Sequence, residues 1–548
     1  MKLEKINLFG KNVYPIGLPS GCVATDPRCA SRLFGLIEEI GMWTTKSYTR
    51  NERIIPEKEE VDNLIAGKGY GFREPILESI GFGSFVNAVG LTNPGCERGR
   101  QEIIDADIPK DRIILGSSAG NSPEDFAYIM RTLDDVVDCH EMNVSCPHAE
   151  GMGIVIGSKP ELVFRYVRRV VNDKKITKPV IVKLPPVNNI SEVSKAAIGA
   201  GAFGLSGINT VPGYSEVLTN KNCGISGRAI FRRGLRCVKD MRDAVGENVF
   251  IQGMGGITTA KDAEMMLKYS DAIAIGSAFA GMTEKDMGRY FREFVSDLKN
   301  GTNFERNRLE SVDTSYEPAR VNKVLNSHCD FKIFRTDVGI NADAGQFVFA
   351  YIPGVGEKPF SVMDNDPLTL GVLERGYFTK HFNQLKKGDE FYFRGPYGNG
   401  INVTLGSSIV LVGGGCGIAG LYLLAKQFSK KAVVTCLLGA KDRHHLPYLR
   451  EFKKAGEVLL ATEDGSAGKK GLVKNLFDDI EFSGQDYFFN CGPKKMIEVV
   501  LPLELKTSKP DRIYTSADYI TRCGIGLCGS CSDEKGRRTC VEGPFMNL

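Results

Sequence analysis

The chain has 548 residues, a length that predicts several compact domains rather than one. Hydrophobic residues make up 42% and charged residues 25%, which is typical of a globular protein and excludes a disordered or low-complexity chain. The formal net charge of +4 is too small at this length to indicate a nucleic-acid or membrane partner. The first residues are interrupted by charges and lack the apolar stretch of a signal peptide, so we expect a soluble, cytoplasmic protein.

Residues 1–305 alternate short apolar runs with helical patterns, as in a parallel sheet with crossover helices. The runs that read as strands end near Gly21, Ser47, Ser118, Cys146, Pro186, Thr210, Gly256 and Ala278. Eight such units predict a (β/α)8 TIM barrel, whose chemistry lies at the carboxyl ends of the strands.

Beyond a charged linker at 306–320, the pattern changes twice. Residues 321–405 alternate short strands with Gly and Pro turns, which predicts a small antiparallel β-barrel. From 406 to 512 strands and helices alternate again, which predicts a second α/β domain. Residues 513–548 form a separate cysteine-rich segment.

Four of the 15 cysteines lie in that last segment: Cys523, Cys528, Cys531 and Cys540. Their C-x4-C-x2-C spacing, with a fourth cysteine later, is the plant-type pattern for a [2Fe–2S] cluster. A zinc site and ordinary core cysteines are the alternatives. We expect the cluster, because soft thiolate ligands in a loop-rich segment suit iron and sulfide.

The segment IVLVGGGCGIAG predicts a nucleotide site, because an apolar strand runs into glycines and then into a helix. The glycines are Gly413, Gly414, Gly415 and Gly417. A tight structural turn is the alternative reading. Upstream, GQFVFAYIPGVGEKPFSV and GPYGNG are segments expected of a flavin-binding barrel, and NCGPKKM follows downstream.

With these motifs, residues 321–548 resemble the electron-transfer subunit of NAD-dependent dihydroorotate dehydrogenases, a ferredoxin-reductase-like family. The resemblance implies an FAD site formed by Lys358, Pro359, Phe360, Ser361, Gly376 and Thr379. It also implies that the four glycines and residues 490–493 border NAD(H). Lys441 and Arg443 could meet the 2′-phosphate of NADPH instead, or form a solvated loop.

Residues 1 to 300 carry the motifs TTK, VNAVGLTNPG, NVSCP, VKL, INT, GISG, GMGGI and AIGSA, and they resemble class 1 dihydroorotate dehydrogenases. The oxidation of dihydroorotate by such an enzyme removes a proton from one ring carbon and a hydride from its neighbour. The resemblance makes Cys146 the candidate base and Lys183 the partner of the flavin ring, both catalytic. An inert buried cysteine and a lysine that reaches solvent are the alternatives.

The same resemblance implies two further sets of contacts in the barrel. FMN would be bound by Ser20, Gly21, Lys46, Lys183, Gly227, Gly255, Gly256, Gly276 and Ser277. The substrate ring would be bound by Asn87, Asn143, His148, Asn209 and Thr210. Asparagine suits a cyclic imide because it offers both a donor and an acceptor.

Two features depart from the family pattern. His148 stands in SCPH where the family has SCPN, and the segment 211–223 is short. With SCPH, this segment resembles the corresponding segment of dihydropyrimidine dehydrogenase, a related barrel that reduces uracil and thymine. A reductase of such a ring, using NADH or NADPH, is therefore the alternative.

Taken together, the sequence predicts a fused oxidoreductase that interconverts dihydroorotate and orotate. Electrons would pass between the ring, FMN, the [2Fe–2S] cluster, FAD and NAD(H), in either direction. The resemblance also implies a homodimer formed through the barrel. A non-catalytic electron-transfer protein is the alternative from another functional class.

Overall fold

The computed structural model describes residues 3–53, 75–81, 83–146, 153–218, 222–302, 312–326, 330–482, 486–516 and 520–548. The described residues form two compact units. The first contains those before residue 54, those from 75 to 313, and those from 525 to 538. The second contains those from 314 to 524 and from 539 to 548. The C-terminal cysteine-rich segment is therefore divided between the two.

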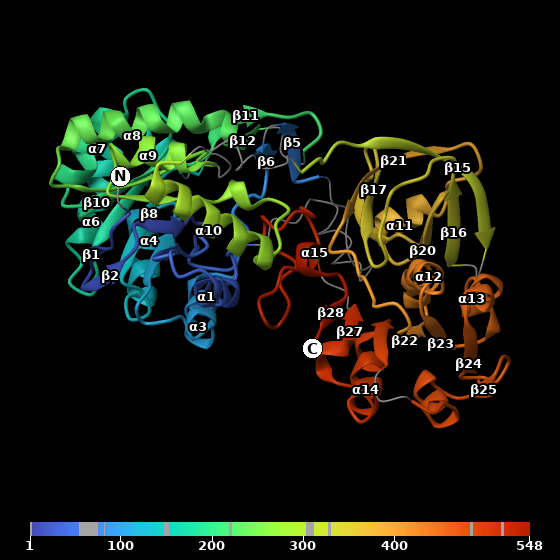
Figure 1. Ribbon diagram of the computed structural model, residues 1–548. Helices are drawn as coiled ribbons and strands as arrows, with labels where there is room; N and C mark the ends of the chain where they lie inside the picture. The colour runs from blue at the N-terminus through green and yellow to red at the C-terminus, as the bar shows by residue number, and fades with distance from the viewer. Residues whose placement is uncertain are drawn as a thin grey trace. The chain divides into compact units, whose positions relative to one another are not determined.

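The first unit is built around a closed barrel of eight parallel strands, in the blue and green part of Figure 1. In chain order these are β3 (Ile16–Leu18), β4 (Met42–Thr44), β7 (Ile113–Ser118), β8 (Cys139–Asn143), β9 (Val180–Leu184), β10 (Gly204–Gly207), β13 (Phe250–Met254) and β14 (Ala272–Ala274). They follow one another around the barrel, with β14 beside β3 and β9 beside β10. The predicted TIM barrel is confirmed, because each predicted strand has its counterpart.

Helices alternate with the barrel strands, and amphipathic sequences explain them. The helix α6 (Pro160–Val171) begins with proline at its first position and buries Val163, Val167 and Val170 along one stripe. The other helices of this unit are α1 (Pro27–Leu36), α3 (Cys96–Asp105), α4 (Pro123–Leu133), α5 (Ile154–Gly157), α7 (Ile190–Gly199), α8 (Phe231–Val245), α9 (Ala260–Leu267) and α10 (Glu284–Asn300), with short 3-10 turns at Arg228–Ile230 and Ser277–Phe279.

The two ends of the barrel differ in chemistry. Apolar side chains near the strand starts, among them Met42, Ile113 and Phe250, form one buried cluster. The hairpin of β1 (Ile6–Leu8) and β2 (Lys11–Val13) adds to this cluster and so closes that end. The open end, where the strands finish, carries the polar residues.

A four-stranded antiparallel sheet also belongs to the first unit. Its order is β11 (Val211–Tyr214), β12 (Asn222–Gly227), β6 (Ser84–Asn87) and β5 (Leu77–Gly81). Segments from two different strand-to-helix connections therefore pair with each other, which brings Asn87 beside Gly224 in register.

The second unit contains two seven-stranded sheets. The antiparallel sheet has the order β18 (Gly356–Ser361), β17 (Phe347–Ile352), β21 (Glu390–Tyr397), β15 (Glu317–Asn326), β16 (Phe331–Thr336), β20 (Leu368–Leu373) and β19 (Asp364–Asn365). The mainly parallel sheet has the order β25 (Lys469–Lys470), β24 (Glu457–Thr462), β23 (Val433–Ala440), β22 (Ser408–Gly414), β26 (Tyr487–Cys491), β27 (Ile513–Ser516) and β28 (Met546–Asn547). An antiparallel sheet followed by an α/β sheet is the arrangement that the sequence predicts.

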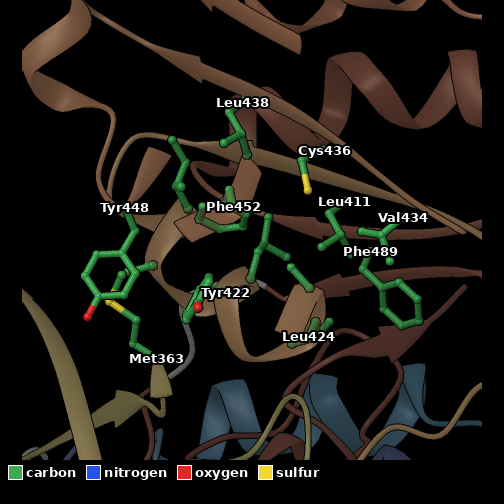
Figure 2. Close-up of a cluster of buried hydrophobic side chains, with 14 of the residues drawn as sticks. Met363, Leu411, Tyr422, Leu424, Val434, Cys436, Leu438, Tyr448, Phe452 and Phe489 are labelled. Atoms are coloured by element: carbon green, nitrogen blue, oxygen red, sulfur yellow. The ribbon is translucent and has the colours of Figure 1, made fainter. Parts of the chain in front are cut away.

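Helices complete the second unit. They are α11 (Tyr377–Phe382), α12 (Gly417–Phe428), α13 (Leu449–Ala455), α14 (Lys494–Glu504) and α15 (Thr539–Glu542), with 3-10 turns at Arg443–His445, Val473–Asp479 and Pro510–Arg512. Figure 2 shows how α12 and α13 cover the parallel sheet: Tyr422 and Phe452 lie among Leu411, Leu438 and other buried side chains. None of the described helices is long and apolar enough to cross a membrane.

Candidate functional site

A cavity of about 200 Å3 lies at the carboxyl ends of the barrel strands. Its lining includes Ser20, Gly21, Lys46, Asn87, Asn143, Cys146, Lys183, Asn209, Thr210, Gly227, Gly255, Gly256, Gly276 and Ser277. These are all the site residues predicted for the barrel except His148, which lies outside the described residues. The structure thus brings together residues that lie between positions 20 and 277 of the sequence.

Lys183 is the most informative side chain in this cavity. It is the fourth residue of β9, paired in register with Asn143 of β8 and Ser206 of β10, and it is only 4% exposed. Within the described part of the chain its ammonium group has no hydrogen-bond or ion-pair partner. Because an unpaired buried charge is costly, the cavity suits an occupant that is anionic or electron-rich. The pyrimidine edge of a flavin fits this requirement.

Glycines form a wall of the cavity where only backbone fits. A Cβ atom on Gly256, with φ of +76°, would lie 2.5 Å from the carbonyl oxygen of Gly227. A Cβ atom on Gly227, with φ of +87°, would lie 2.1 Å from the carbonyl oxygen of Gly83. Close backbone approach without side chains is what a phosphate needs in order to reach backbone N–H groups. The residues present therefore fit the phosphate of FMN.

The cavity amides are held by a hydrogen-bond network. The Asn143 Nδ2 atom donates to Ser47 Oγ at 2.9 Å, and Ser145 Oγ donates to Asn143 Oδ1 at 2.7 Å. Asn209 Nδ2 donates to Ser145 Oγ at 2.9 Å, and the backbone N–H of Thr210 donates to Asn209 Oδ1 at 2.8 Å. Both amides are thus oriented before any ligand enters.

Cys146 lies three residues after the end of β8 and lines the same cavity, with 6% of its surface exposed. Its backbone carbonyl accepts the N–H of Ile154 at 3.1 Å, which holds the chain that carries the thiol. Apolar neighbours Ala119 and Leu91 pack against it. A thiol in such a place can exchange a proton with a bound ring once it is ionised.

Two lining residues come from the far end of the chain, and the sequence analysis did not predict them. Leu527 and Cys528 contribute to the wall of the cavity. The Leu527 carbonyl accepts the N–H of Val23 at 3.0 Å, and the Ile525 carbonyl accepts the N–H of Gly281 at 2.9 Å. The segment 525–538 is therefore fixed on the barrel.

Arg538 anchors the same segment from inside. It is 0% exposed, and its guanidinium donates to the carbonyl oxygens of Gly526 at 3.0 Å and Met282 at 2.9 Å. Because an arginine is rarely buried without acceptors, this arrangement indicates a specific packing of the segment rather than a loose tail.

The four cysteines of the C-terminal segment have the donor chemistry of an iron–sulfur site. Cys523, Cys528, Cys531 and Cys540 are each at most 6% exposed, and none forms a disulfide in the described chain. Within the same residues no three His, Cys, Asp or Glu side chains form a group that could hold a single metal ion. Thiols are the ligands of iron–sulfur clusters, so the [2Fe–2S] site stays a prediction from the sequence.

In the second unit a buried ion pair supports the first of these cysteines. The guanidinium of Arg394 is 1% exposed and pairs with the Glu357 carboxylate at 2.9 Å. It also donates to the Cys523 carbonyl at 3.1 Å. Burial alone lowers the pKa of Arg394, but the facing Glu357 raises it above its ordinary range, so the guanidinium stays charged.

The predicted FAD residues lie on β18 and at the start of α11. Lys358, Pro359, Phe360 and Ser361 form the last part of β18. Gly376 precedes α11, and Thr379 Oγ1 accepts the N–H groups of Arg375 at 2.9 Å and Gly376 at 3.0 Å. This fixes the turn that the resemblance places beside the FAD pyrophosphate.

The predicted dinucleotide residues lie where β22 meets α12. A Cβ atom on Gly417 would lie 2.4 Å from the Cys491 carbonyl oxygen, so α12 approaches the end of β26 closely. On Gly420 a Cβ atom would lie 3.2 Å from Ser361 Oγ and 3.3 Å from Cys491 Sγ. The ends of β18, β22 and β26 therefore meet beside one glycine-rich turn, as a bound dinucleotide requires.

The side chain of Asn490, one of the residues that the resemblance places beside NAD(H), is buried. It is 0% exposed and donates to Glu504 Oε2 at 2.9 Å. Its amide thus serves the protein core, and only its backbone can border a nucleotide. Burial raises the pKa of Glu504 to about 7, and the hydrogen bond from Asn490 offsets only part of this effect.

Comparison with known proteins gives two kinds of match. The family model described as "Dihydroorotate dehydrogenase" matches residues 7–287. The chain is 37% identical over 285 residues to the catalytic subunit of dihydroorotate dehydrogenase B (NAD(+)) from Pyrococcus abyssi, covering 50% of this chain and 87% of that one.

A second relative matches a stretch of similar length. The chain is 37% identical over 234 residues to the probable electron transfer subunit of dihydroorotate dehydrogenase B (NAD(+)) from Thermococcus kodakarensis, covering 42% of this chain and 96% of that one. One polypeptide therefore contains regions similar to both kinds of subunit. The chain belongs to the dihydroorotate dehydrogenase family of oxidoreductases.

Proposed function

We propose that this chain is a NAD-linked dihydroorotate dehydrogenase that combines catalytic and electron-transfer functions in one polypeptide. The observation that carries the proposal is the barrel cavity, where Cys146, oriented amides and an unpaired Lys183 face the same space. A thiol, amides and a buried cation are the groups needed to exchange a proton with an imide ring beside a flavin.

We further propose FMN in the barrel cavity, FAD and NAD(H) in the second unit, and a [2Fe–2S] cluster on Cys523, Cys528, Cys531 and Cys540. Support comes from the glycine walls at Gly227 and Gly256, from the turn at Gly417, and from the four buried thiols. When bound, flavins supply hydride chemistry and convert electron pairs to single electrons, which an iron–sulfur cluster can carry.

The side chains of the cavity have distinct roles in this proposal. In the oxidation of dihydroorotate, the Cys146 thiolate takes the proton from one ring carbon. Lys183 places a positive charge where a flavin ring gains negative charge on reduction. Asn143 and Asn209 hold the ring through its carbonyl groups, so that the ring carbon faces the thiol.

The test is anaerobic NADH oxidation by the purified full chain, with orotate, uracil and thymine in parallel and with flavin and iron measured in the same sample. We expect turnover with orotate. Turnover with uracil or thymine alone would replace the proposal by the dihydropyrimidine alternative. NADH-driven flavin reduction with no ring turnover would indicate an electron-transfer protein without the proposed catalysis.

A further inference from the structure

An ion pair joins two of the loops that line the barrel cavity. Arg228 directly follows Gly227, and its guanidinium pairs with the carboxylate of Asp262 at the start of α9. The Asp262 side chain is 4% exposed and the Arg228 side chain 44%, so the carboxylate lies inside and the arginine reaches the surface. Neither is among the described residues that line the cavity, and neither has a role in the mechanism above.

Asp262 fixes the loop between β13 and α9. Its Oδ2 atom accepts hydrogen bonds from the N–H and the Oγ1 of Thr258, both at 3.1 Å, and from the N–H of Thr259 at 3.0 Å. The Asp262 N–H donates in return to Thr259 Oγ1 at 3.2 Å, which completes a capping box. On the other side, the hydroxyl of the buried Tyr290 donates to the Thr258 carbonyl at 2.8 Å. The end of the loop is therefore anchored from two directions.

The N–H groups just before this anchor remain available to a ligand. Among the described residues, those of Gly255, Gly256 and Ile257 donate no hydrogen bond, and all three residues line the cavity. Gly255 and Gly256 have φ of +112° and +76°, and successive N–H groups in such a turn can converge on one anion. Because Asp262 takes the next two N–H groups, a phosphate can use only these three from this loop.

The ion pair ties this loop to the turn that follows β12. A Cβ atom on Gly256 would lie 2.5 Å from the Gly227 carbonyl oxygen and 2.8 Å from the backbone nitrogen of Phe231, so the loop packs directly on that turn. Arg228 belongs to the same turn, and its guanidinium lies 4.9 Å from the centroid of the Phe231 ring. Its bond to Asp262 therefore holds the two backbone segments together.

The pair also balances the charge beside the phosphate position. A phosphate monoester carries about two negative charges at neutral pH, and an uncompensated carboxylate next to its N–H donors would repel it. Arg228 neutralises Asp262, so Asp262 can hold the loop without this repulsion. We propose that Arg228 and Asp262 are positioning residues that make the cavity select a phosphorylated flavin over riboflavin. The inference rests on the proposed FMN site.

The test compares FMN with riboflavin, which has the same ring and ribityl chain but no phosphate. The full chain is freed of FMN by dialysis at high salt and is kept in saturating FAD, so that the second unit stays occupied. Each flavin is titrated, and the free flavin is separated by ultrafiltration and quantified by chromatography. Arg228→Gln removes the charge of the ion pair. Arg232→Gln is the matched control, because Arg232 is exposed on α8 and has no ion pair with the described residues.

We expect the dissociation constant for FMN to rise about fivefold in Arg228→Gln, while that for riboflavin changes by less than about twofold, because only the phosphate meets the uncompensated carboxylate. Arg232→Gln should change neither value by more than about twofold. In about 1 M salt the effect on FMN should fall below about twofold, since salt screens charges but does not repair a displaced loop. Equal weakening of both flavins, or an FMN effect that salt leaves unchanged, would overturn the proposal.

A second variant separates the charge from the hydrogen bonds. Asp262→Asn keeps an oxygen for the N–H groups but removes the carboxylate charge, so adding Arg228→Gln in this background should weaken FMN binding by less than about twofold. Additive effects of the two substitutions would overturn the proposed pairing. A wild type that binds FMN no more tightly than riboflavin would refute the FMN site itself, whereas a preference for FMN that is unchanged in Arg228→Gln would refute only the role of the ion pair.

Discussion

The cavity of the first unit and the nucleotide turn of the second are built in opposite ways. In the barrel, side chains with their own chemistry converge from the strand ends, among them Cys146 and Lys183. In the second unit, the decisive feature at Gly417 is the lack of a side chain, because the helix passes so close to the Cys491 carbonyl. The first site depends on which atoms are present, and the second on how closely backbone segments approach.

The largest effect that this comparison predicts is at Cys146. Replacing it by alanine removes the proposed base, and we expect kcat for orotate-dependent NADH oxidation to fall by about 10²- to 10⁴-fold, as for other lost general bases. The matched control is Cys139→Ala in β8, which is buried in the apolar cluster at the other end of the barrel. We expect this control to keep kcat while losing stability. Similar losses in both variants would mean that Cys146 serves only packing.

The eight barrel strands could be predicted from the sequence, because each is a local apolar run of the right length. The cavity residues could be predicted because they sit in motifs at those strand ends. The contact between Val23 and Leu527 could not, since it joins distant parts of the chain and leaves no local pattern. Glu141 lies two positions before Asn143 in β8, and its partners Ser117 and Ser206 come from other strands, so no local pattern could predict them.

The second prediction concerns stability in the second unit and has a definite pH window. Burial raises the pKa of Glu504 to about 7, above the ordinary value of 4.5, so the folded state binds a proton that the unfolded state releases. The stabilisation is therefore present below pH 4.5 and is lost as the pH rises to 7. The free energy of unfolding falls by about 3 kcal/mol when Glu504 ionises in the folded state, at about 1.4 kcal/mol for each unit of pKa.

Hydrogen exchange of backbone amides in β22 and β26 of the full chain measures this loss. We expect Glu504→Gln to abolish the pH dependence between 5 and 7 and to be the more stable protein at pH 8. Glu498→Gln, on the exposed side of the same helix α14, is the control and should leave the dependence intact. A pH-independent wild type in this window would show that Glu504 is not protonated in the folded state.

The third prediction tests whether the nucleotide turn depends on the close approach of backbone segments at Gly417. Gly417→Ala places a methyl group against the Cys491 carbonyl and should force α12 away, at a cost of about 1 to 3 kcal/mol. We expect NADH-driven flavin reduction to slow about tenfold, while FMN in the barrel stays bound. Gly406→Ala, with φ of +80° and open space around its Cβ position, is the control for substituting a glycine in this unit. Equal rates in the two variants would contradict the close approach.

The smallest predicted effect concerns the choice between NADH and NADPH, and it lies in the turn after β23. Lys441 and Arg443 are exposed there, but Asp442 lies between them, and its Oδ1 accepts from the His444 backbone at 2.8 Å and from His445 Nδ1 at 2.8 Å. The hydrogen bond from His445 lowers the pKa of Asp442, so this carboxylate remains ionised. A fixed carboxylate repels a 2′-phosphate and can accept from ribose hydroxyls, which favours NADH.

We therefore expect Arg443→Gln to change KM for NADH by less than about twofold, and Asp442→Asn to increase the relative use of NADPH severalfold. Steady-state rates with each nucleotide, at fixed orotate, measure both. A wild type that prefers NADPH and loses this preference in Arg443→Gln would assign the 2′-phosphate to Arg443. In that case the second unit, like the first, would depend on a side chain at its ligand and not on backbone approach alone.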